Sequence, residues 1–339
     1  DVPGNPLGGQ MRVLDIATQE LVDVLTPMPA QPISWSADGG QVAVSRLDPY
    51  SSRYREGVFE LLVFNMLTEK AHAISPVPHQ SLLSGALTAD GAMTYVQGGL
   101  LHRLELNQQL QPLEHTGAIT DELTDSPRWS ANGKHLVYLS GNRLKHKLSD
   151  GMVVDITPQI PYTLDTPAER YVVHAGRLFT GADDQYAKDQ YVWISGNVIE
   201  KITPPMDTGD LLMVDASDQT LVPGLFEMHA HLGETSEIQG RIWLSYGITT
   251  VRDPGSNPYV AKARQEAWDS GRRVGPRTHV TGYLTDGNRV YYTMAEGISS
   301  RAHLHMALQR TEQLQLDFIK TYVRLPDEWQ KEVVTFAHN

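Results

Sequence analysis

The sequence predicts a multidomain protein in which a partial β-propeller and a small β-sandwich precede the first half of a TIM-like (β/α)8 barrel. Three observations lead to this fold class. Short hairpin motifs repeat through the first 160 residues, glycine-separated strands occupy about 168–222, and strands and helices alternate after 223. A chain of 339 residues is longer than one ordinary domain, so it has room for all three parts.

The first 160 residues carry an internal repeat built on a tight turn. WSADG at 35–39, LTADG at 87–91 and WSANG at 129–133 lie 52 and 42 residues apart, and apolar stretches flank them. Asp-Gly and Asn-Gly supply the positive-φ residues of hairpin turns, so each unit is expected to be a small antiparallel sheet. Four strands in every 40 to 50 residues are typical of propeller blades, and a β-sandwich with similar hairpins is the alternative.

The repeat fills residues 1–160 with about three and a half blades, because a half-blade precedes three complete units. A closed ring needs four or more blades, so we expect the propeller to be partial. From 168 to 222 the short strands show no helical period, which predicts a small β-sandwich that flanks the barrel.

Residues 223–339 predict the first four βα units of a parallel barrel. Strands are expected at 224–231, 247–252, 277–283 and 317–323, and helices at 236–245, 258–271, 299–315 and 327–338. A complete barrel takes about 250 residues. We therefore expect the C-terminal half of the barrel to be supplied by the rest of a longer polypeptide or by a complementary chain.

The composition excludes several kinds of protein. Lys and Arg total 28 against 40 for Asp and Glu, and a net charge of −12 argues against binding to nucleic acid. The chain has no cysteine, so it has no disulfide, thiolate metal site or thiol nucleophile. No apolar run is long enough to span a membrane.

Two histidines are the sharpest chemical feature of the chain. His229 and His231 lie near the end of the first predicted barrel strand, in LFEMHAHL at 225–232. Side chains alternate along a strand, so both imidazoles are expected on one side, at the mouth where barrel enzymes bind substrate. His303 and His305 have the same spacing but lie on a predicted helix, where two residues are about 200° apart. They are interpreted as ordinary helix residues.

The fourth predicted strand carries a third candidate, Lys320. Strand alternation places Lys320, Tyr322 and Arg324 on one face, with Phe318 deeper on that face toward the barrel interior. An unpaired ammonium there is costly to bury. One solution is a lysine carboxylated by carbon dioxide, which can bridge two metal ions; the other is a lysine paired with a carboxylate.

LVPGLFEMHAHL, YGITTVRDPG and DFIKTYVRLP resemble the first, second and fourth strand segments of the amidohydrolase superfamily. They are most similar to its imidazolonepropionase- and prolidase-like members that follow a TolB-type β-propeller. The resemblance implies that His229, His231 and a carboxylated, metal-bridging Lys320 bind two divalent metal ions. Zinc suits these ligands, and manganese or iron fits nearly as well. The family takes further ligands from strands five, six and eight, so His338, on the last predicted helix, is not expected to be a ligand.

The resemblance implies hydrolysis of a C–N bond in an amide, cyclic amide or small peptide by a metal-activated water. Arg324 and Tyr322 are candidate contacts for a substrate carboxylate. The loop after the third strand adds Asn288, Arg289, Tyr291 and Tyr292 as further candidates. A solvated loop whose tyrosines only pack against the fold would have the same sequence pattern, so both interpretations stay open. Asp253, which ends the second strand, is interpreted as a cap of the following loop.

Two other functions are consistent with these residues. One is a catalytically inactive propeller and barrel that binds a partner, and the other is a mononuclear deaminase-like hydrolase in which Lys320 stays an ordinary amine. The expected partners are a small-molecule or small-peptide substrate and the remainder of the polypeptide, and the oligomeric state, including a homo-oligomer, stays open. The residues do not fix a compartment, whereas the resemblance implies a periplasmic or exported protein.

Overall fold

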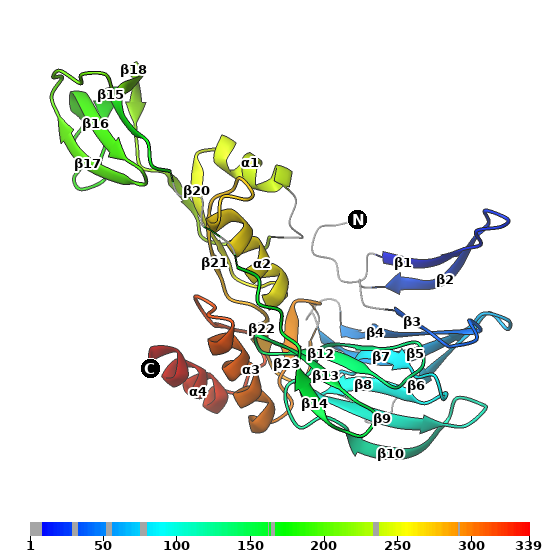
Figure 1. Cartoon of the computed structure of the whole chain (residues 1–339). Coiled ribbons are helices and arrows are strands. Elements are labelled where there is room, and N and C mark those ends of the chain that lie inside the picture. The colour runs from blue at the N-terminus through cyan, green and yellow to red at the C-terminus, as the bar shows by residue number, and fades with distance from the viewer. Residues whose placement is uncertain are drawn as a thin grey trace. The chain divides into compact units, whose positions relative to one another are not determined.

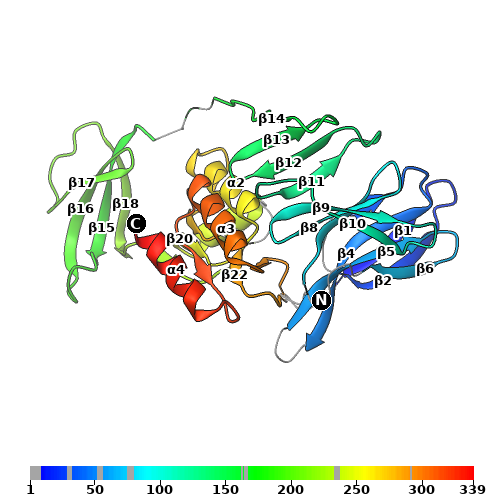
Figure 2. The same cartoon turned by 90° about the horizontal axis from the view of Figure 1, so that it is seen from below.

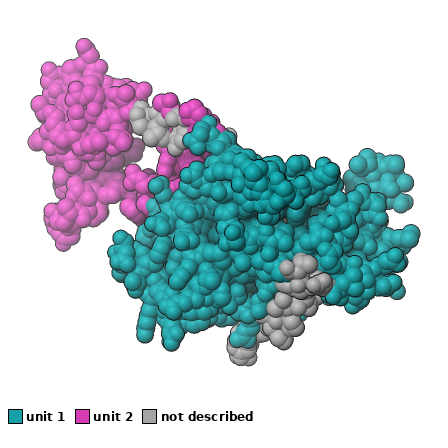
Figure 3. Space-filling model, turned by 60° about the horizontal axis from the view of Figure 1, so that its bottom comes forward, with its two compact units in different colours: residues 1–159, 254–259, 281–339 teal, residues 160–253, 260–280 magenta. Residues whose placement is uncertain are grey.

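The computed structural model of the chain describes residues 9–28, 33–51, 56–74, 80–161, 163, 167–232, 237–290 and 292–339. These residues divide into two compact units (Figure 3). Unit 1 comprises Asp1–Gln159, Pro254–Tyr259 and Thr281–Asn339, and unit 2 comprises Ile160–Asp253 and Val260–Val280. Each unit is described by itself below. No helix among the described residues is both long and apolar enough to cross a membrane.

Antiparallel sheets make up the N-terminal part of unit 1 (Figures 1 and 2). A two-stranded sheet comes first, with β1 (Gly9–Leu14) and β2 (Leu21–Met28). Three four-stranded sheets follow, and in each the strands pair in chain order. Their strands are β3 (Ile33–Trp35), β4 (Gln41–Ser51), β5 (Glu56–Asn65) and β6 (Lys70–Ile74); β7 (Leu83–Leu87), β8 (Met93–Gln97), β9 (Leu100–Leu106) and β10 (Pro112–Ala118); and β11 (Asp125–Trp129), β12 (Leu136–Ser140), β13 (Arg143–Lys147) and β14 (Val153–Asp155).

The repeated motif forms the same turn in all three four-stranded sheets. Gly39, Gly91 and Gly133 have φ of 73°, 85° and 69°, so each occupies the left-handed region that glycine tolerates best. Each glycine N–H donates to the carbonyl of the residue three positions earlier, at 2.8–3.0 Å. The predicted hairpins are therefore confirmed.

Apolar side chains fill the space between successive sheets. Val44 and Phe64 of the second sheet pack against Met11 and Val13 of the first. A larger cluster joins the second sheet to the third, and a further one joins the third to the fourth. Three four-stranded sheets and one two-stranded sheet match the predicted three and a half units, but the described residues form no closed ring. The propeller itself stays a prediction.

The predicted β-sandwich at 168–222 is wrong, because unit 2 has a single sheet there. Its strands are β15 (Arg170–Leu178), β16 (Ala187–Ser195), β17 (Val198–Thr203) and β18 (Leu212–Leu221), in the order β17-β16-β15-β18. β18 pairs parallel to β15, which keeps the last strand in the same sheet instead of starting a second one. The strand pattern alone carries no information about which edge the last strand joins.

The C-terminal part of the chain is α/β and has two three-stranded parallel sheets. In unit 2, β19 (Leu225–Glu227), β20 (Ile248–Asp253) and β21 (Arg277–Val280) pair in chain order. In unit 1, β22 (Leu284–Asp286) lies between β23 (Ala295–Gly297) and β24 (Lys320–Thr321). The helices are α1 (Glu237–Ser245), α2 (Pro258–Asp269), α3 (Arg301–Gln313) and α4 (Asp327–His338), close to the predicted ranges.

The strands of this region are shorter than predicted, and the four-strand barrel half is not a single sheet among the described residues. The third predicted strand ends at Val280, because Gly282 turns the chain with φ +70° and a Cβ there would lie 2.7 Å from Leu316. β22 and β23 form in or next to the loop that was predicted after the third strand, since β22 gains parallel partners on both sides. The half-barrel therefore stays a prediction, whereas the alternation of strands and helices is confirmed.

Candidate active site

His229 and His231 follow β19 in unit 2 and lie next to each other. β19 ends at Glu227, so neither histidine is in the strand, yet their ring centroids are 5.3 Å apart at 76°. The segment continues along β20, because Ala230 N–H donates to the Arg252 carbonyl at 3.2 Å and Arg252 Nε donates to the Met228 carbonyl at 2.7 Å. The expected pairing of the two imidazoles is found although the strand is shorter than predicted.

Both imidazoles are exposed, so a ligand has access to them. Glu227, the last residue of β19, fixes the backbone that leads to the histidines, because its Oε1 accepts a hydrogen bond from the backbone N–H of His229 at 2.8 Å. Two neighbouring imidazoles suit a divalent metal but supply only part of its coordination sphere. Within the described ranges, no three His, Asp or Glu side chains are grouped closely enough to hold a metal ion.

Asp253, at the end of β20, forms a buried ion pair instead of only capping a loop. Its side chain and that of Arg264 on α2 are both 0 % exposed, and the Arg264 guanidinium donates to the Asp253 carboxylate. Arg264 also donates to the Leu232 carbonyl at 3.3 Å. This arginine therefore connects the helix both to β20 and to the residue that follows the two histidines.

Lys320 lies in unit 1, in β24 beside β22. It is half-buried and opposite Leu284 in the strand pair. Its neighbour Ile319 packs against the apolar cluster between α3 and α4, while Phe318, predicted for the barrel interior, is 48 % exposed and precedes the strand. The prediction that Phe318 faces the barrel interior is thus wrong, because β24 begins at Lys320 and strand alternation does not extend to Phe318. The metal-bridging role of Lys320 stays a prediction.

Two predicted substrate residues, Tyr292 and Tyr322, come together in unit 1. Their ring centroids are 6.2 Å apart at 75°, and both rings pack against the apolar cluster of Leu47, Phe59 and Leu284. Tyr322 also extends the β24 pairing, because its N–H donates to the Thr285 carbonyl at 2.9 Å. The two tyrosines are partly buried packing residues, and a contact with substrate stays a prediction.

Arg324 already has a carboxylate partner. β24 ends at Thr321 and the Leu325 N–H closes a turn on the Tyr322 carbonyl, so strand alternation does not determine the position of Arg324. The Arg324 guanidinium lies 3.1 Å from Oδ2 of the buried Asp286. The backbone N–H of Arg324 donates to Oδ1 of the same carboxylate at 2.8 Å. Asn288 and Arg289 are exposed in the loop after β22, and Tyr291 lies outside the described residues.

Unit 1 also holds a buried polar cluster that the sequence did not predict. Arg310 on α3 is bonded to Glu296 of β23 and, at 3.1 Å, to Asp125 of β11. His303 Nε2 lies 3.2 Å from the same Glu296 carboxylate, and the Tyr259 hydroxyl donates to Asp125 at 2.9 Å. The sequence offered one sign of this cluster, which is the charged Arg310 on the otherwise mostly apolar buried face of α3. The cluster joins α3 to two sheets of unit 1.

The cluster shifts the pKa of its members. Burial by itself raises the pKa of Glu296, but the Arg310 charge and the His303 hydrogen bond outweigh it and lower the pKa to about 2. Burial by itself lowers the pKa of Arg310, but the negative charges of Glu296 and Asp125 raise it. The pKa of Arg310 therefore lies well above its usual value. Glu296 is therefore ionised at neutral pH.

The other candidate histidines lie on α3 and α4, and their interpretation as residues outside a metal site stays a prediction. His303 is 4 % exposed and bonds to Glu296, whereas His305 is exposed and lies 3.3 Å from Glu332. The two rings thus leave α3 in different directions, as helical spacing requires. His338 is the last residue of α4 and is exposed.

Comparison with known proteins gives matches to solved structures alone. No protein-family model and no curated protein matches the chain. Among solved structures, it is similar to a Xaa-Pro dipeptidase with bound methionine (22 % identity, 50 % of this chain and 54 % of that one, TM-score 0.42). It is also similar to molinate hydrolase (16 %, 51 % and 52 %, 0.44) and to the ochratoxinase of A. niger (14 %, 51 % and 54 %, 0.41).

The chain spans about half the length of these three structures. Each of the three matches covers about half of this chain. At these identities and TM-scores, the matches assign neither a family nor an activity to the chain.

Proposed function

We propose that the chain belongs to a metal-dependent amidohydrolase that hydrolyses a C–N bond in an amide, cyclic amide or small peptide. The observation that carries this proposal is the pair of exposed imidazoles of His229 and His231, whose ring centroids lie 5.3 Å apart directly after the first strand of a parallel sheet. Parallel sheets present ligand sites at the carboxyl ends of their strands.

The residues of unit 2 hold the histidine pair in place. The Glu227 carboxylate accepts from the His229 N–H, and Arg252 holds the Met228 carbonyl. In the neutral form, each imidazole offers one ring nitrogen as a metal ligand, and the other is then a hydrogen-bond donor. A divalent metal bound there would supply an activated water and polarise the substrate carbonyl.

The rest of the site is proposed from the amidohydrolase resemblance. Lys320, carboxylated, would bridge two metal ions, and zinc fits the ligands best, followed by manganese or iron. Tyr292, Tyr322, Arg289 and Arg324 are the proposed contacts of a substrate carboxylate. Arg324 would have to share its guanidinium with Asp286, which lies 3.1 Å away.

We also propose that the four N-terminal sheets are blades of a TolB-type β-propeller. The identical turns at Gly39, Gly91 and Gly133 and the apolar clusters between successive sheets support this architecture.

The first experiment measures the metal content of the full protein after supplementation with zinc or manganese. Two equivalents support the binuclear enzyme, one equivalent supports the deaminase-like alternative, and none favours the inactive binding protein. Hydrolysis of N-acyl amino acids and dipeptides is measured on the same samples.

A matched pair of variants tests the histidines themselves. The double variant His229→Ala/His231→Ala should lose at least one metal equivalent and the hydrolysis. The control is His135→Ala/His146→Ala, which removes another pair of neighbouring histidines, with ring centroids 5.1 Å apart on the fourth sheet. Equal metal loss in both double variants would contradict the proposal.

A further inference from the structure

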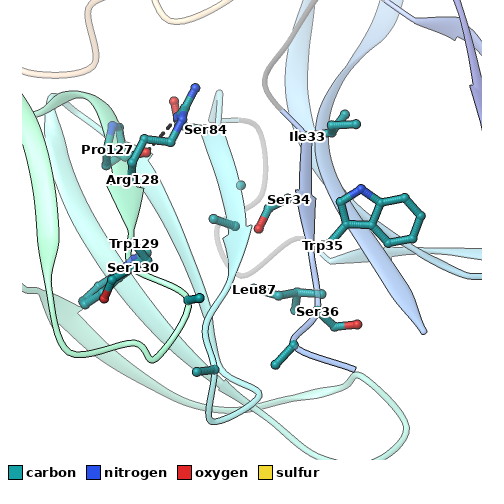
Figure 4. Close-up of a pocket in the computed structure, with 15 residues that line it drawn as sticks. Ile33, Ser34, Trp35, Ser36, Ser84, Leu87, Pro127, Arg128, Trp129 and Ser130 are labelled. Atoms are coloured by element: carbon teal, nitrogen blue, oxygen red, sulfur yellow. Dashed lines mark hydrogen bonds between the residues drawn. The ribbon is translucent and has the colours of Figure 1, made fainter. Parts of the chain in front are cut away.

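A pocket of about 350 Å³ opens between the first strands of the three four-stranded sheets of unit 1 (Figure 4). Its walls are β3, β7 and β11 and the turns that follow them. The volume falls at the lower end of the range for small-molecule sites. This pocket belongs to unit 1 alone and is independent of the proposed metal site.

Equivalent positions of the repeat face the pocket. Trp35, Leu87 and Trp129 begin the repeated motif, and the residues before them are Ser34, Ala86 and Arg128. Side chains alternate between the two faces of a strand. Trp129 of β11 points toward the neighbouring sheet, because its indole N–H donates to Thr94 of β8 at 3.0 Å. Ser34 and Arg128 therefore leave their strands on the opposite side from the tryptophans, as Figure 4 shows.

Two walls of the pocket carry the same backbone irregularity. Ser84 on β7 and Ser126 on β11 have φ of 54° and 50°, and each lies three residues before the start of its motif. The strand register shifts at both places, between Leu83 and Ala86 and between Asp125 and Arg128. Left-handed serines are strained, and such residues and bulges cluster at binding sites, where a bulge re-aims a side chain.

Arg128 determines the charge of the pocket. It is exposed, and among the described residues that line the pocket it is the single charged side chain. In the part of the chain that the structure describes, its guanidinium bonds to the Pro127 carbonyl at 2.8 Å and forms no ion pair. A guanidinium with no carboxylate partner, in a pocket without acidic side chains, is a site for an anion.

The other walls limit the ligand to a small one. They are mostly short side chains, with Ala37, Ala86, Ala89 and Ala131 as apolar contacts and Ser34 as a hydroxyl. A planar carboxylate matches the two parallel N–H groups of a guanidinium, and the alanines suit a small apolar body beside it. The protein as a whole carries −12, so attraction of an anion has to be local to Arg128.

We propose that this pocket binds a small carboxylate through Arg128, either a free short-chain acid or the C-terminal residues of a peptide. The site lies among the N-terminal sheets and goes beyond the proposed hydrolase activity.

Binding of three probes to the full protein tests the proposal by isothermal titration. N-acetyl-alanyl-alanine has a free carboxylate, its C-terminal amide has the same shape without the charge, and propionate represents a free acid. We expect the peptide acid to bind at least ten-fold more tightly than the amide. Equal or tighter binding of propionate assigns the site to free acids, and weaker binding assigns it to peptide ends. Equal affinity for acid and amide would overturn the proposal.

Three variants locate the binding. Arg128→Gln should weaken the acid at least ten-fold, whereas Arg143→Gln, which removes an exposed arginine from the same sheet, should leave its affinity unchanged. Ala86→Leu fills the pocket without changing its charge and should also abolish binding. Circular dichroism confirms that each variant is folded. Unchanged affinity in a folded Arg128→Gln or Ala86→Leu protein would refute this site.

Discussion

Each of the two parallel sheets ends a strand in a buried aspartate paired with an arginine, but the two pairs differ in depth. In unit 2, Asp253 and Arg264 are both 0 % exposed, and the arginine comes from a helix. In unit 1, Asp286 is 1 % exposed, while Arg324 is 14 % exposed and comes from a turn. The first pair is closed to solvent and has a structural role, whereas the second retains an edge that a ligand can reach.

The difference also separates the predicted site residues. The histidine pair in unit 2 lies beside the closed ion pair, and Arg264 holds the Leu232 carbonyl next to it. In unit 1, the predicted substrate residues Tyr322 and Arg324 follow β24 directly, and Arg324 itself belongs to the ion pair. A change at Asp253 therefore acts on the support of the proposed metal site, whereas a change at Asp286 acts directly on Arg324, a proposed substrate contact.

The largest effect is expected for Asp253→Ala. This change leaves the Arg264 charge buried without its carboxylate, which costs about 3–5 kcal/mol of unfolding free energy. Hydrogen exchange of α2 measures it, because opening of unit 2 exposes that helix. Asp218→Ala, at an exposed position of the same unit, is the control and should leave exchange unchanged. Similar exchange in both variants would mean that the closed pair does not stabilise unit 2.

An intermediate effect is expected for the second ion pair of the unit 1 sheet, Glu296 with Arg310. The pKa of the Glu296 carboxyl is about 2, below the ordinary value near 4.5. Ionised Glu296 therefore stabilises the fold above pH 4.5, and this stabilisation is lost as the pH falls toward 2. The total is about 3 kcal/mol. Urea unfolding at a series of pH values measures it.

Glu296→Gln should lower the stability at pH 7 and flatten its pH dependence between 4.5 and 2. The control is Glu312→Gln, an exposed position on the same helix as Arg310. A Glu296→Gln protein that still loses stability over this range as the natural sequence does would assign the titration to other groups.

The smallest change in stability is expected for Arg324→Lys. The ammonium keeps its charge near Asp286 but loses the planar fork, and the pair is partly open to solvent, so the loss should be about 1 kcal/mol. If Arg324 also binds a substrate carboxylate, KM for N-acyl amino acids should rise about ten-fold with little change in kcat. An unchanged KM would leave Arg324 with the ion pair alone.

Local structure was largely predictable. Asp-Gly and Asn-Gly define the turns at Gly39, Gly91 and Gly133, since glycine accepts positive φ, and the apolar period of 3.6 defines α4 over the predicted range. The neighbouring imidazoles of His229 and His231 were also predicted. The turns and α4 depend on interactions within a few residues, which the sequence contains, whereas the histidine segment is also held by Arg252 of β20.

The ends and partners of strands were not predictable. Nothing in 168–222 specifies that β18 joins β15 in one sheet, or in 277–286 that the chain leaves one sheet at Val280 and enters another at Leu284. Pairing of distant strands depends on which edge is open in the folded chain. The predicted strands were therefore too long, and Arg324 and Phe318 were assigned positions from an alternation that does not extend to them.

The sequence by itself determined the residue types of the candidate chemistry: two histidines two residues apart, a lysine and arginine on a later segment, and no cysteine. The tertiary structure decided which charges are neutralised. Arg264, Arg310 and Arg324 each have a carboxylate partner, from positions 11 to 185 residues away, whereas Arg128 lines a pocket. Burial makes such pairing obligatory, because an unpaired charge inside the fold is costly, and only the folded chain brings the partners together.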